Sequence, residues 1–366
     1  MLENVVSKTR ATITHIQARS VMVPLEYPVK TSVGVVSSSP LVLIDLMLDC
    51  GVVGRAYVFT YTPLALESAR ALVEDLGSVL IGESVSPLAL ERTLLSRLRL
   101  IGRTGIAMMA CAGLDMAVWD ALAKLHGVPL CELLGGSVKA LPAYDSHSMD
   151  GITIGTLRAK KAVDAGFRAI KIKIGYKTLD EDCAVIEEIK KCLGAQVELM
   201  VDYNQSLSVP EAIRRIRVIQ EFGLAWVEEP TLQENYAGHA RIRSSVAAGI
   251  QMGENWCGPD EMLKALEAEA CDFAMPDVMK IGGVTGWMKA AALAELKGIP
   301  LSSHIFQEIS AHLLAVSPTA HWLERMDLAG PIITTPLQFR DGYAIPNDTP
   351  GTGVEWNEDA VARFAV

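Results

Sequence analysis

Cysteines are few in this sequence and show neither a disulfide nor a metal-binding pattern. The seven cysteines are scattered and odd in number, and no two of them form a Cys-x-x-Cys pair. This argues against a disulfide framework and against a zinc–thiolate site. Reduced thiols in a cytoplasmic protein are the expected state.

An excess of basic residues is absent as well. Lys and Arg number 33 against 43 Asp and Glu, which gives a formal net charge of −10. A nucleic-acid partner is therefore not expected, because binding phosphate needs a basic surface. An anionic small molecule is not excluded as a substrate, since a metal ion and a few local lysines can reverse the field inside one pocket.

The sequence also lacks a segment that we expect to enter a membrane. The most apolar stretch, residues 41–48, is interrupted by Asp45 and is far shorter than the roughly 18–20 residues that a bilayer span needs. Residues 1–19 include three basic residues and show no apolar run of a signal peptide. We therefore expect a soluble, cytoplasmic protein without a membrane partner.

Residues 1–135 have the pattern of an α+β domain. Residues 12–23 and 40–50 have strand character, and residues 63–134 carry Ala, Leu and Met at helical spacing. The segment 24–40 between the strands is rich in Pro, Gly, Ser and Thr, which predicts a long surface loop. Strands followed by helices indicate a segregated α+β unit.

Residues 136–330 alternate short β-prone runs with helical stretches. The runs cover residues 143–147, 169–174, 198–203, 225–228, 250–253, 273–276, 300–304 and 321–324. Helices are predicted between them, among them 180–192, 209–222, 259–270 and 285–297. The alternation predicts a TIM-type barrel of seven or eight β/α units, with the last helix missing or replaced.

A doubly wound sheet is the competing α/β fold, but no Gly-x-Gly-x-x-Gly motif follows a strand to support it. The tail, residues 331–366, is rich in Pro, Gly and Asp. We expect this tail to pack back on the N-terminal domain and to complete it as a cap on the barrel.

Charged residues end nearly every predicted barrel strand, which is where such barrels place their active sites. Asp202, Glu228 and Glu254 end three successive strands at a constant spacing of 26 residues. Three adjacent carboxylates repel one another, and a hard divalent cation relieves the repulsion, which favours Mg²⁺, with Mn²⁺ as the alternative. A single acidic residue at such a position more often caps the next helix, but three in register indicate a metal site.

Two lysines end the second strand of the predicted barrel. Lys171 and Lys173 point to the same face, because side chains alternate along a strand. Burial and mutual repulsion are expected to lower the pKa of each lysine and to make one of them a usable base near neutral pH. Snorkelling or ion-paired lysines are the structural alternative, and a Schiff-base lysine is another chemical one, although it would not need three carboxylates.

An acid and a histidine end consecutive strands on the other side of the barrel. Asp277 and His304 are therefore expected to be neighbours, and a carboxylate beside an imidazole fixes its tautomer and supports a base in the physiological range. A lone histidine would more often be structural. Glu324 ends the last strand and could bind a substrate carboxylate if burial keeps it protonated.

The strand order places Lys173 and His304 on roughly opposite sides of the barrel mouth, with the three carboxylates between them. A racemase requires a base on each side of one metal-bound substrate. One base removes the α-proton from one face, and the conjugate acid of the other returns a proton to the opposite face. The enediolate formed between these steps needs stabilisation, which the metal and a donor such as Glu324 would supply.

Four motifs resemble those of the enolase superfamily and, within it, of the mandelate racemase group. They are Ala143-Tyr144-Asp145-Ser146-His147-Ser148, Val201-Asp202-Tyr203-Asn204-Gln205-Ser206, Met252-Gly253-Glu254-Asn255-Trp256 and Ser302-Ser303-His304-Ile305-Phe306-Gln307-Glu308. The resemblance extends along essentially the whole chain. It implies a homo-oligomer in which residues 24–40 close over a small carboxylate substrate as a flap.

The resemblance also implies a role for each of the acidic and basic site residues. The Mg²⁺ ligands would be Asp202, Glu228 and Glu254. Lys173 would be the base for one enantiomer, with Lys171 tuning its pKa and contacting the carboxylate. His304, held by Asp277, would be the base for the other enantiomer.

The remaining site residues would contact the substrate. Glu324 and Ser146 would bind its carboxylate, and Asn204 its α-hydroxyl. In the flap, Val29, Thr31 and Val36 would line the pocket, and the apolar wall suits an aryl or similar side group, as in mandelate. Lys30, by contrast, adds a charge to the flap, and Met326 lies just past Glu324, where it could change the shape of the pocket.

Two alternatives remain open at this point. A dehydratase of a hydroxy acid or acid sugar could use the same residues, with the enediolate expelling a β-hydroxyl group. The apolar flap favours the racemase, because a polyol needs polar partners. From a different class, a metal-stabilised barrel could bind a ligand without turnover, but it would have no need of flanking bases.

Overall fold

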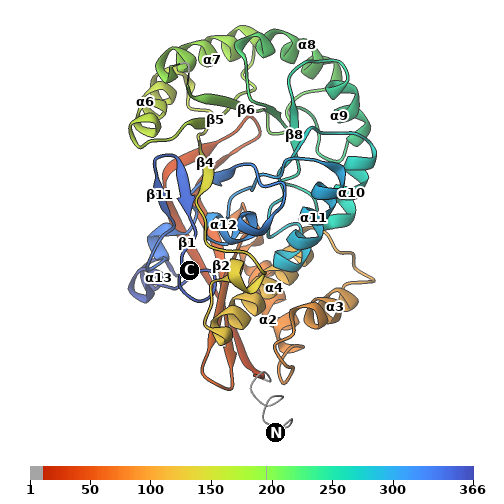
Figure 1. The fold of residues 1–366 in the computed structure, drawn as a ribbon, viewed down its shortest axis with the longest axis vertical. Coiled ribbons are helices and arrows are strands. Elements are labelled where there is room, and N and C mark those ends of the chain that lie inside the picture. The colour runs from red at the N-terminus through yellow and green to blue at the C-terminus, as the bar shows by residue number, and fades with distance from the viewer. Residues whose placement is uncertain (1–10, 195) are drawn as a thin grey trace.

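The computed structural model describes residues 11–194 and 196–366. The first ten residues, on which part of the expectation about a signal peptide depends, lie outside this range. Within it, an N-terminal α+β domain lies beside a barrel of parallel strands that is surrounded by helices (Figure 1). The fold class predicted from the sequence is confirmed.

The N-terminal domain is built on a three-stranded antiparallel sheet. Its strands β1 (Ile13–Lys30), β2 (Val35–Leu48) and β3 (Val53–Phe59) pair in that order. The short turn η2 (Pro63–Ala65) and the helices α2 (Leu66–Ser78), α3 (Pro87–Arg97), α4 (Gly105–His126) and α5 (Leu130–Leu133) follow. Helix α4 packs closely on the sheet because Gly113 has no Cβ, which would lie 2.6 Å from side-chain carbons of both Ile44 and Val58.

Helix α4 is long and apolar enough to cross a membrane by length and composition. However, 83% of its most apolar window is buried inside the protein. It contacts β3, α2 and the barrel helix α11 (Gly283–Lys297). Its apolar character therefore serves the core between the two domains.

The segment 24–40, predicted to be a long surface loop, is instead the outer half of a hairpin. Val29 pairs with Val36, so that β1 continues to residue 30 and β2 begins at residue 35. Only residues 31–34 form the turn. The prediction was wrong because the Pro and Ser content indicated a loop, whereas valines opposite each other across two strands favour pairing.

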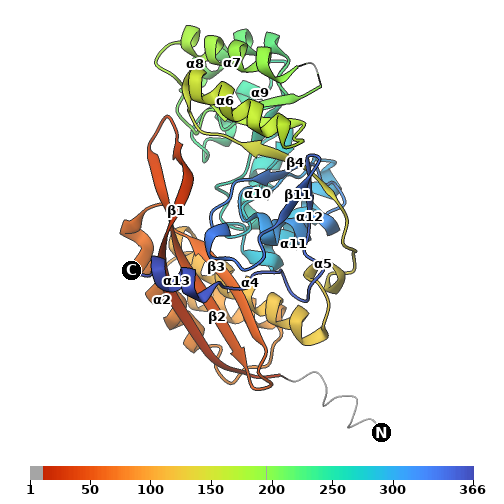
Figure 2. The ribbon, with the colours of Figure 1, turned by 90° about the vertical axis from the view of Figure 1, so that its left-hand side faces the viewer.

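The hairpin extends from the N-terminal sheet to the barrel (Figure 2). Near its tip, Ser32 Oγ donates to the carbonyl oxygen of Tyr203 at 3.0 Å. Closer to the sheet, Ser148 Oγ donates to Pro28 O at 2.9 Å. These contacts fix the hairpin against two strand ends of the barrel. Lys30 is exposed, so its charge does not enter the substrate cavity.

The barrel alternates strands and helices in the predicted order. The strands are β4 (Leu141–Ser146), β5 (Ala169–Lys173), β6 (Glu198–Asp202), β7 (Val227–Glu228), β8 (Ile250–Met252), β9 (Phe273–Ala274) and β10 (Leu323–Arg325). The helices outside them are α6 (Gly151–Asp164), α7 (Leu179–Leu193), α8 (Val209–Ile219), α9 (Tyr236–Arg243), α10 (Pro259–Glu267), α11 and α12 (Gln307–Val316), with the short turn η3 (Gln220–Phe222) after α8. Parallel pairing from β4 to β9 aligns the carboxyl ends of the strands at one mouth.

The barrel closes where β10 pairs with β4. The predicted seventh strand, residues 300–304, forms only isolated bridges, of Leu301 with Ala274 and Ala320 and of His304 with Asp277. In the described part of the chain, β10 is followed by the short turn η4 (Gly330–Ile332) and not by an α-helix. The missing last helix is as predicted.

The C-terminal tail contacts both parts of the molecule. Its hairpin of β11 (Gln338–Arg340) and β12 (Tyr343–Ile345) extends the barrel sheet, because β12 pairs antiparallel with β4. Helix α13 (Glu358–Phe364) packs on β1. Between them, Trp356 Nε1 donates to Asp45 Oδ1 in β2 at 2.9 Å. The tail thus joins the N-terminal sheet to the barrel.

Candidate active site

Strand register brings the predicted site residues together at one end of the barrel. Lys173 is paired with Asp202, and Asp202 with Glu228, across β5, β6 and β7. Glu254 follows β8 by two residues. These strands are buried and mostly apolar up to their charged ends. Because the apolar part of each strand is buried in the barrel, its charged side chain lies at the barrel mouth.

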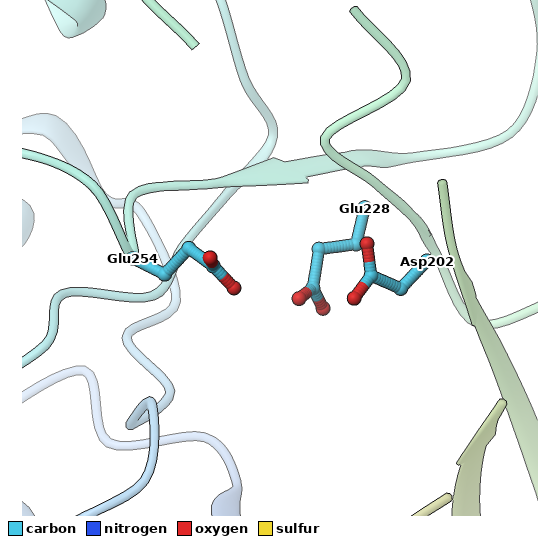
Figure 3. A group of neighbouring side chains, drawn as sticks. All are labelled: Asp202, Glu228 and Glu254. Atoms are coloured by element: carbon cyan, nitrogen blue, oxygen red, sulfur yellow. The ribbon is translucent and has the colours of Figure 1, made fainter. Parts of the chain in front are cut away.

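Asp202, Glu228 and Glu254 form a compact carboxylate group. One ligand oxygen from each residue lies within 4.8 Å of the other two. The side chains point toward a common space (Figure 3), and their residues are 0%, 0% and 8% exposed. Three buried carboxylates with oxygens at this separation fit a hard divalent cation such as Mg²⁺.

Each of the three carboxylates contacts one basic side chain. Lys173 Nζ lies 2.5 Å from Asp202 Oδ2, and Lys171 Nζ lies 2.8 Å from Glu228 Oε1. His304 Nε2 lies 3.2 Å from Glu254 Oε2. The carboxylate group therefore links the lysine side of the barrel mouth to the histidine side.

The expected lowering of the lysine pKa values is not found in this charge arrangement. Burial favours the neutral amine of Lys173, but the Asp202 carboxylate outweighs it and raises the pKa above its ordinary value. Burial acts in the same way on Lys171, where Glu228 and Glu324 raise the pKa. The prediction took into account the repulsion between the two lysines. It was wrong because the carboxylates on other strands attract the ammonium groups more strongly than the lysines repel each other.

Glu324 also differs from its expected protonated state. Burial favours the neutral acid, but Lys171 and His304 outweigh it and hold the pKa of Glu324 well below its usual range. Lys171 Nζ lies 2.8 Å from Glu324 Oε1, and the backbone N–H of Ile305 donates to Oε2 at 2.9 Å. The carboxylate thus holds both Lys171 and the backbone that follows His304.

His304 and Asp277 are neighbours, as predicted. His304 Nδ1 lies 2.8 Å from Asp277 Oδ2, and Asp277 Oδ1 accepts from the backbone N–H of Met279 at 2.7 Å. Burial lowers the pKa of His304, but Glu254 and the hydrogen bond with Asp277 outweigh it and raise the pKa. An ionised Asp277 requires the proton on Nδ1, which leaves Nε2 to face Glu254 and the cavity.

Several residues that follow the strand ends have positive φ angles without being glycine. Asn204 (44°) and Gln205 (66°) follow β6, Glu229 (36°) follows β7, and Ile305 (37°) and Phe306 (47°) follow the His304 segment. L-residues rarely adopt this region, and its strain concentrates at functional sites. The backbone turns sharply where the charged side chains enter the cavity.

Both proposed bases line one cavity of about 410 Å³ between the hairpin and the barrel mouth. The polar lining includes Tyr61, Lys173, Asn204, Gln205, Glu254, Asn255, Lys280 and His304. The apolar lining includes Leu25, Val29, Val33, Val36, Phe59 and Met326. Thr31 of the hairpin turn also lines it. The flap residues Val29, Thr31 and Val36, predicted to line the substrate pocket, thus all line this cavity.

Ser146 and Asn204 offer unsatisfied polar atoms near the site. Asn204 Oδ1 and Ser146 Oγ are buried and have no hydrogen-bond partner among the described residues. Ser146 lines a small adjacent cavity that shares Leu25, Val29 and Met326 with the main one. Buried polar atoms normally have partners, so these two are available to a ligand.

Among the polar cavity residues, sequence reasoning gave no role to Tyr61, Gln205, Asn255 and Lys280. Asn255 was part of a quoted motif but was given no role. Lys280 follows Asp277 by three residues, and its charge in an apolar stretch was the available signal. Tyr61 Oη lies 3.5 Å from Asp277 Oδ2 although the residues are 216 apart in sequence, so no local pattern pointed to it.

Two family models match the chain. Residues 13–135 match the mandelate racemase/muconate lactonizing enzyme N-terminal domain, and residues 156–360 match the enolase C-terminal domain-like family. Among curated proteins, the chain is 31% identical over 337 residues to 3,6-anhydro-alpha-L-galactonate cycloisomerase of Streptomyces coelicolor. That match covers 91% of this chain and 93% of the relative.

Solved structures show the same similarity. An enolase from Bradyrhizobium, crystallised with magnesium and mandelic acid, is 47% identical, with a TM-score of 0.95 and coverage of 98% of this chain and 99% of that one. L-Talarate dehydratase from Polaromonas sp. JS666, complexed with Mg and L-glucarate, is 27% identical. Its TM-score is 0.90, with 97% and 98% coverage. The chain therefore belongs to the enolase superfamily and has the N- and C-terminal domains of its mandelate racemase/muconate lactonizing group.

Proposed function

We propose that this protein is a Mg²⁺-dependent racemase of mandelate or a similar aryl 2-hydroxy acid, acting through two bases. The observation that carries the proposal is the placement of Lys173 and His304. Both line the same cavity, and each contacts an outer member of the carboxylate group, Asp202 on one side and Glu254 on the other. A substrate held at this group would have one base on each side.

The carboxylates of Asp202, Glu228 and Glu254 would hold the metal ion. When bound, Mg²⁺ supplies positive charge that stabilises the negative charge developing on the substrate carboxylate. The related Bradyrhizobium structure contains magnesium, which supports Mg²⁺ as the ion that these three buried carboxylates would bind.

The side chains divide the proton transfers between them. With Asp202 engaged as a metal ligand, its charge would no longer favour the Lys173 ammonium, so Lys173 can act as a neutral base. It then removes the α-proton from one enantiomer, and the imidazolium of His304 delivers a proton to the opposite face. In the reverse direction, His304 Nε2 accepts the proton and the Lys173 ammonium delivers one. Asp277 keeps the His304 proton on Nδ1, so that Nε2 can act in both directions.

The remaining polar residues would bind the substrate. The Lys171 ammonium can contact its carboxylate, and Ser146 Oγ can donate to the same group. Asn204 Oδ1 can accept a hydrogen bond from the α-hydroxyl. Glu324 is proposed here as the carboxylate that positions Lys171 and the backbone after His304, and not as a proton donor.

The walls of the cavity support an aryl side group. Val29, Val36, Phe59 and Met326 present an apolar surface beside the two bases. A ring buried against such a wall gains affinity from apolar contact, whereas the hydroxyl groups of a sugar acid would lose hydrogen bonds to water. The related structure that holds mandelic acid agrees with this choice.

The test follows the optical rotation of each mandelate enantiomer with the protein and Mg²⁺. We expect the rotation to decay to zero from either enantiomer at rates consistent with an equilibrium constant of one. A chelator such as EDTA should stop the decay, and added Mg²⁺ should restore it. Stable rotation from both enantiomers under magnesium-rich conditions would contradict the proposal.

Dehydration of an acid sugar is the second candidate, favoured by the related dehydratase structure with L-glucarate. The polar cavity residues Gln205 and Lys280 could contact a polyol chain. A screen of acid sugars for 2-keto acid formation discriminates between the two reactions. Turnover of sugars without racemisation of mandelate would favour the dehydratase.

A further inference from the structure

Lys280 lines the active-site cavity without a part in the proposed proton transfers. It lies in the turn that leads from β9 to α11. Its Nζ donates to Asn255 Oδ1 at 2.7 Å and lies 4.3 Å from the ring centre of Tyr61. The ammonium is thus held between the N-terminal domain and the strand end that carries Glu254.

Asn255 also contacts two acidic side chains. Its Nδ2 donates to Glu229 Oε1 at 3.0 Å and Oε2 at 3.1 Å, and to Glu254 Oε1 at 3.2 Å. Glu229 is fully buried. The side-chain amide therefore lies between one ammonium and two buried carboxyl groups.

Lys280 and Glu254 together allow only one orientation of the Asn255 amide. An ammonium has hydrogens to donate and no lone pair to accept, and an ionised carboxylate can only accept. The reverse orientation would place the amide oxygen against the Glu254 carboxylate, and the amide hydrogens against the Lys280 ammonium. Lys280 therefore selects the orientation in which Asn255 donates to Glu254.

We propose that Lys280 is a positioning residue for the metal site. By orienting the Asn255 amide, it holds the Glu254 carboxylate in place on the side opposite His304. The inference rests on the proposed role of Glu254 as a metal ligand. Partners of this kind, which contact a ligand and not the metal, typically change metal affinity by about 10- to 100-fold when removed.

A simple charge effect predicts the opposite sign. If Lys280 were only a nearby positive charge, its removal would reduce repulsion of Mg²⁺ and tighten binding. If Lys280 acts through Asn255, its removal frees the amide to turn and weakens binding. The sign of the change in Mg²⁺ affinity thus distinguishes orientation from charge.

The experiment measures Mg²⁺ affinity by calorimetric titration of the full chain and four variants. We expect K280M and N255A each to weaken Mg²⁺ binding about tenfold. The double variant K280M/N255A should bind Mg²⁺ with an affinity within about twofold of that of the weaker-binding single variant, because both substitutions break the same series of contacts. K280R keeps a cationic donor and should remain within about threefold of the wild-type affinity.

Control measurements separate this effect from a general loss of charge or fold. K264M removes an exposed lysine on α10 and should leave Mg²⁺ affinity unchanged. Unchanged or tighter binding by K280M, or losses that add in the double variant, would overturn the inference while leaving the proposed function intact. Failure of the wild-type chain to bind Mg²⁺ would overturn both the proposed metal site and the role of Lys280.

Discussion

The hydroxyl group of Tyr57 in β3 donates a hydrogen bond to Glu308 Oε2 at the start of α12, at 2.8 Å. Both side chains are buried, and the ring of Tyr57 stacks on Phe306 with 4.9 Å between centroids. This contact joins the N-terminal sheet to the barrel directly behind the His304 segment. Burial raises the pKa of Glu308 to about 7, so the joint contains a group that titrates near neutral pH.

The pKa of Glu308 predicts how stability depends on pH. The folded-state pKa lies above the ordinary value of 4.5, so the contribution of Glu308 is fully present below pH 4.5 and is lost as the pH rises through 7. In the wild type, Glu308 should lower the free energy of unfolding by about 2–3 kcal/mol between pH 5 and pH 8, and we expect this decrease to be absent in E308Q. Urea unfolding at the two pH values measures the difference. The exposed control E295Q should behave like the wild type, and an unchanged pH dependence in E308Q would contradict the assignment.

The apolar wall of the hairpin predicts a change in substrate affinity. V29A removes two carbon atoms from the cavity wall, and losing roughly 1 kcal/mol of apolar contact should raise KM for mandelate about fivefold with little change in kcat. Steady-state kinetics with both enantiomers measure this. V218A on the outer face of α8 is the matched control. An unchanged KM in V29A would show that the substrate does not touch the hairpin.

The contacts of Asp277 predict the effect of D277N. The backbone N–H of Met279 holds Oδ1, so the amide nitrogen of the substituted side chain would face His304 Nδ1. Nδ1 would then have to accept, which places the imidazole proton on Nε2 and blocks it as a base. We expect proton removal by His304 to fall about 100-fold while removal by Lys173 continues. Equal losses for both enantiomers would argue against this separate role.

The carboxylate group predicts that Mg²⁺ stabilises the folded chain. At about 100 times its dissociation constant, Mg²⁺ should raise the free energy of unfolding by about 2.7 kcal/mol. D202N and E228Q should lose most of this gain, whereas E187Q on α7 should keep it. Chemical unfolding with Mg²⁺ and with EDTA measures the gain. A gain that persists in D202N and E228Q would place the ion elsewhere.

The barrel and its charged strand ends could be predicted from the sequence because each strand is a short apolar run with a charged end. This pattern placed Asp202, Glu228 and Glu254 on adjacent strands, and the structure brings them together. Helix positions followed from amphipathic spacing, as for α7 with its Thr178 capping box. Local sequence was enough to predict a helix or strand wherever the burial of that one element determines its conformation.

The sequence was less informative where contacts between distant segments decide the outcome. The hairpin strands contain Pro and Ser, and only their cross-strand pairing, such as that of Val29 with Val36, shows that they are strands. The pKa directions of Lys173 and Glu324 depend on partners from other strands. The contact of Lys280 with Tyr61 unites two domains, and no spacing rule predicts it.

The most direct test of the two-base account is exchange of the substrate α-proton in D₂O, followed by proton NMR for each mandelate enantiomer. K173A and H304A should each lose racemisation, with a loss of at least about 100-fold. Each variant should still exchange the α-proton of one enantiomer, and the two variants should retain opposite ones. Loss of exchange from both enantiomers in either single variant, or retention of the same enantiomer in both, would contradict the placement of one base on each side of the substrate.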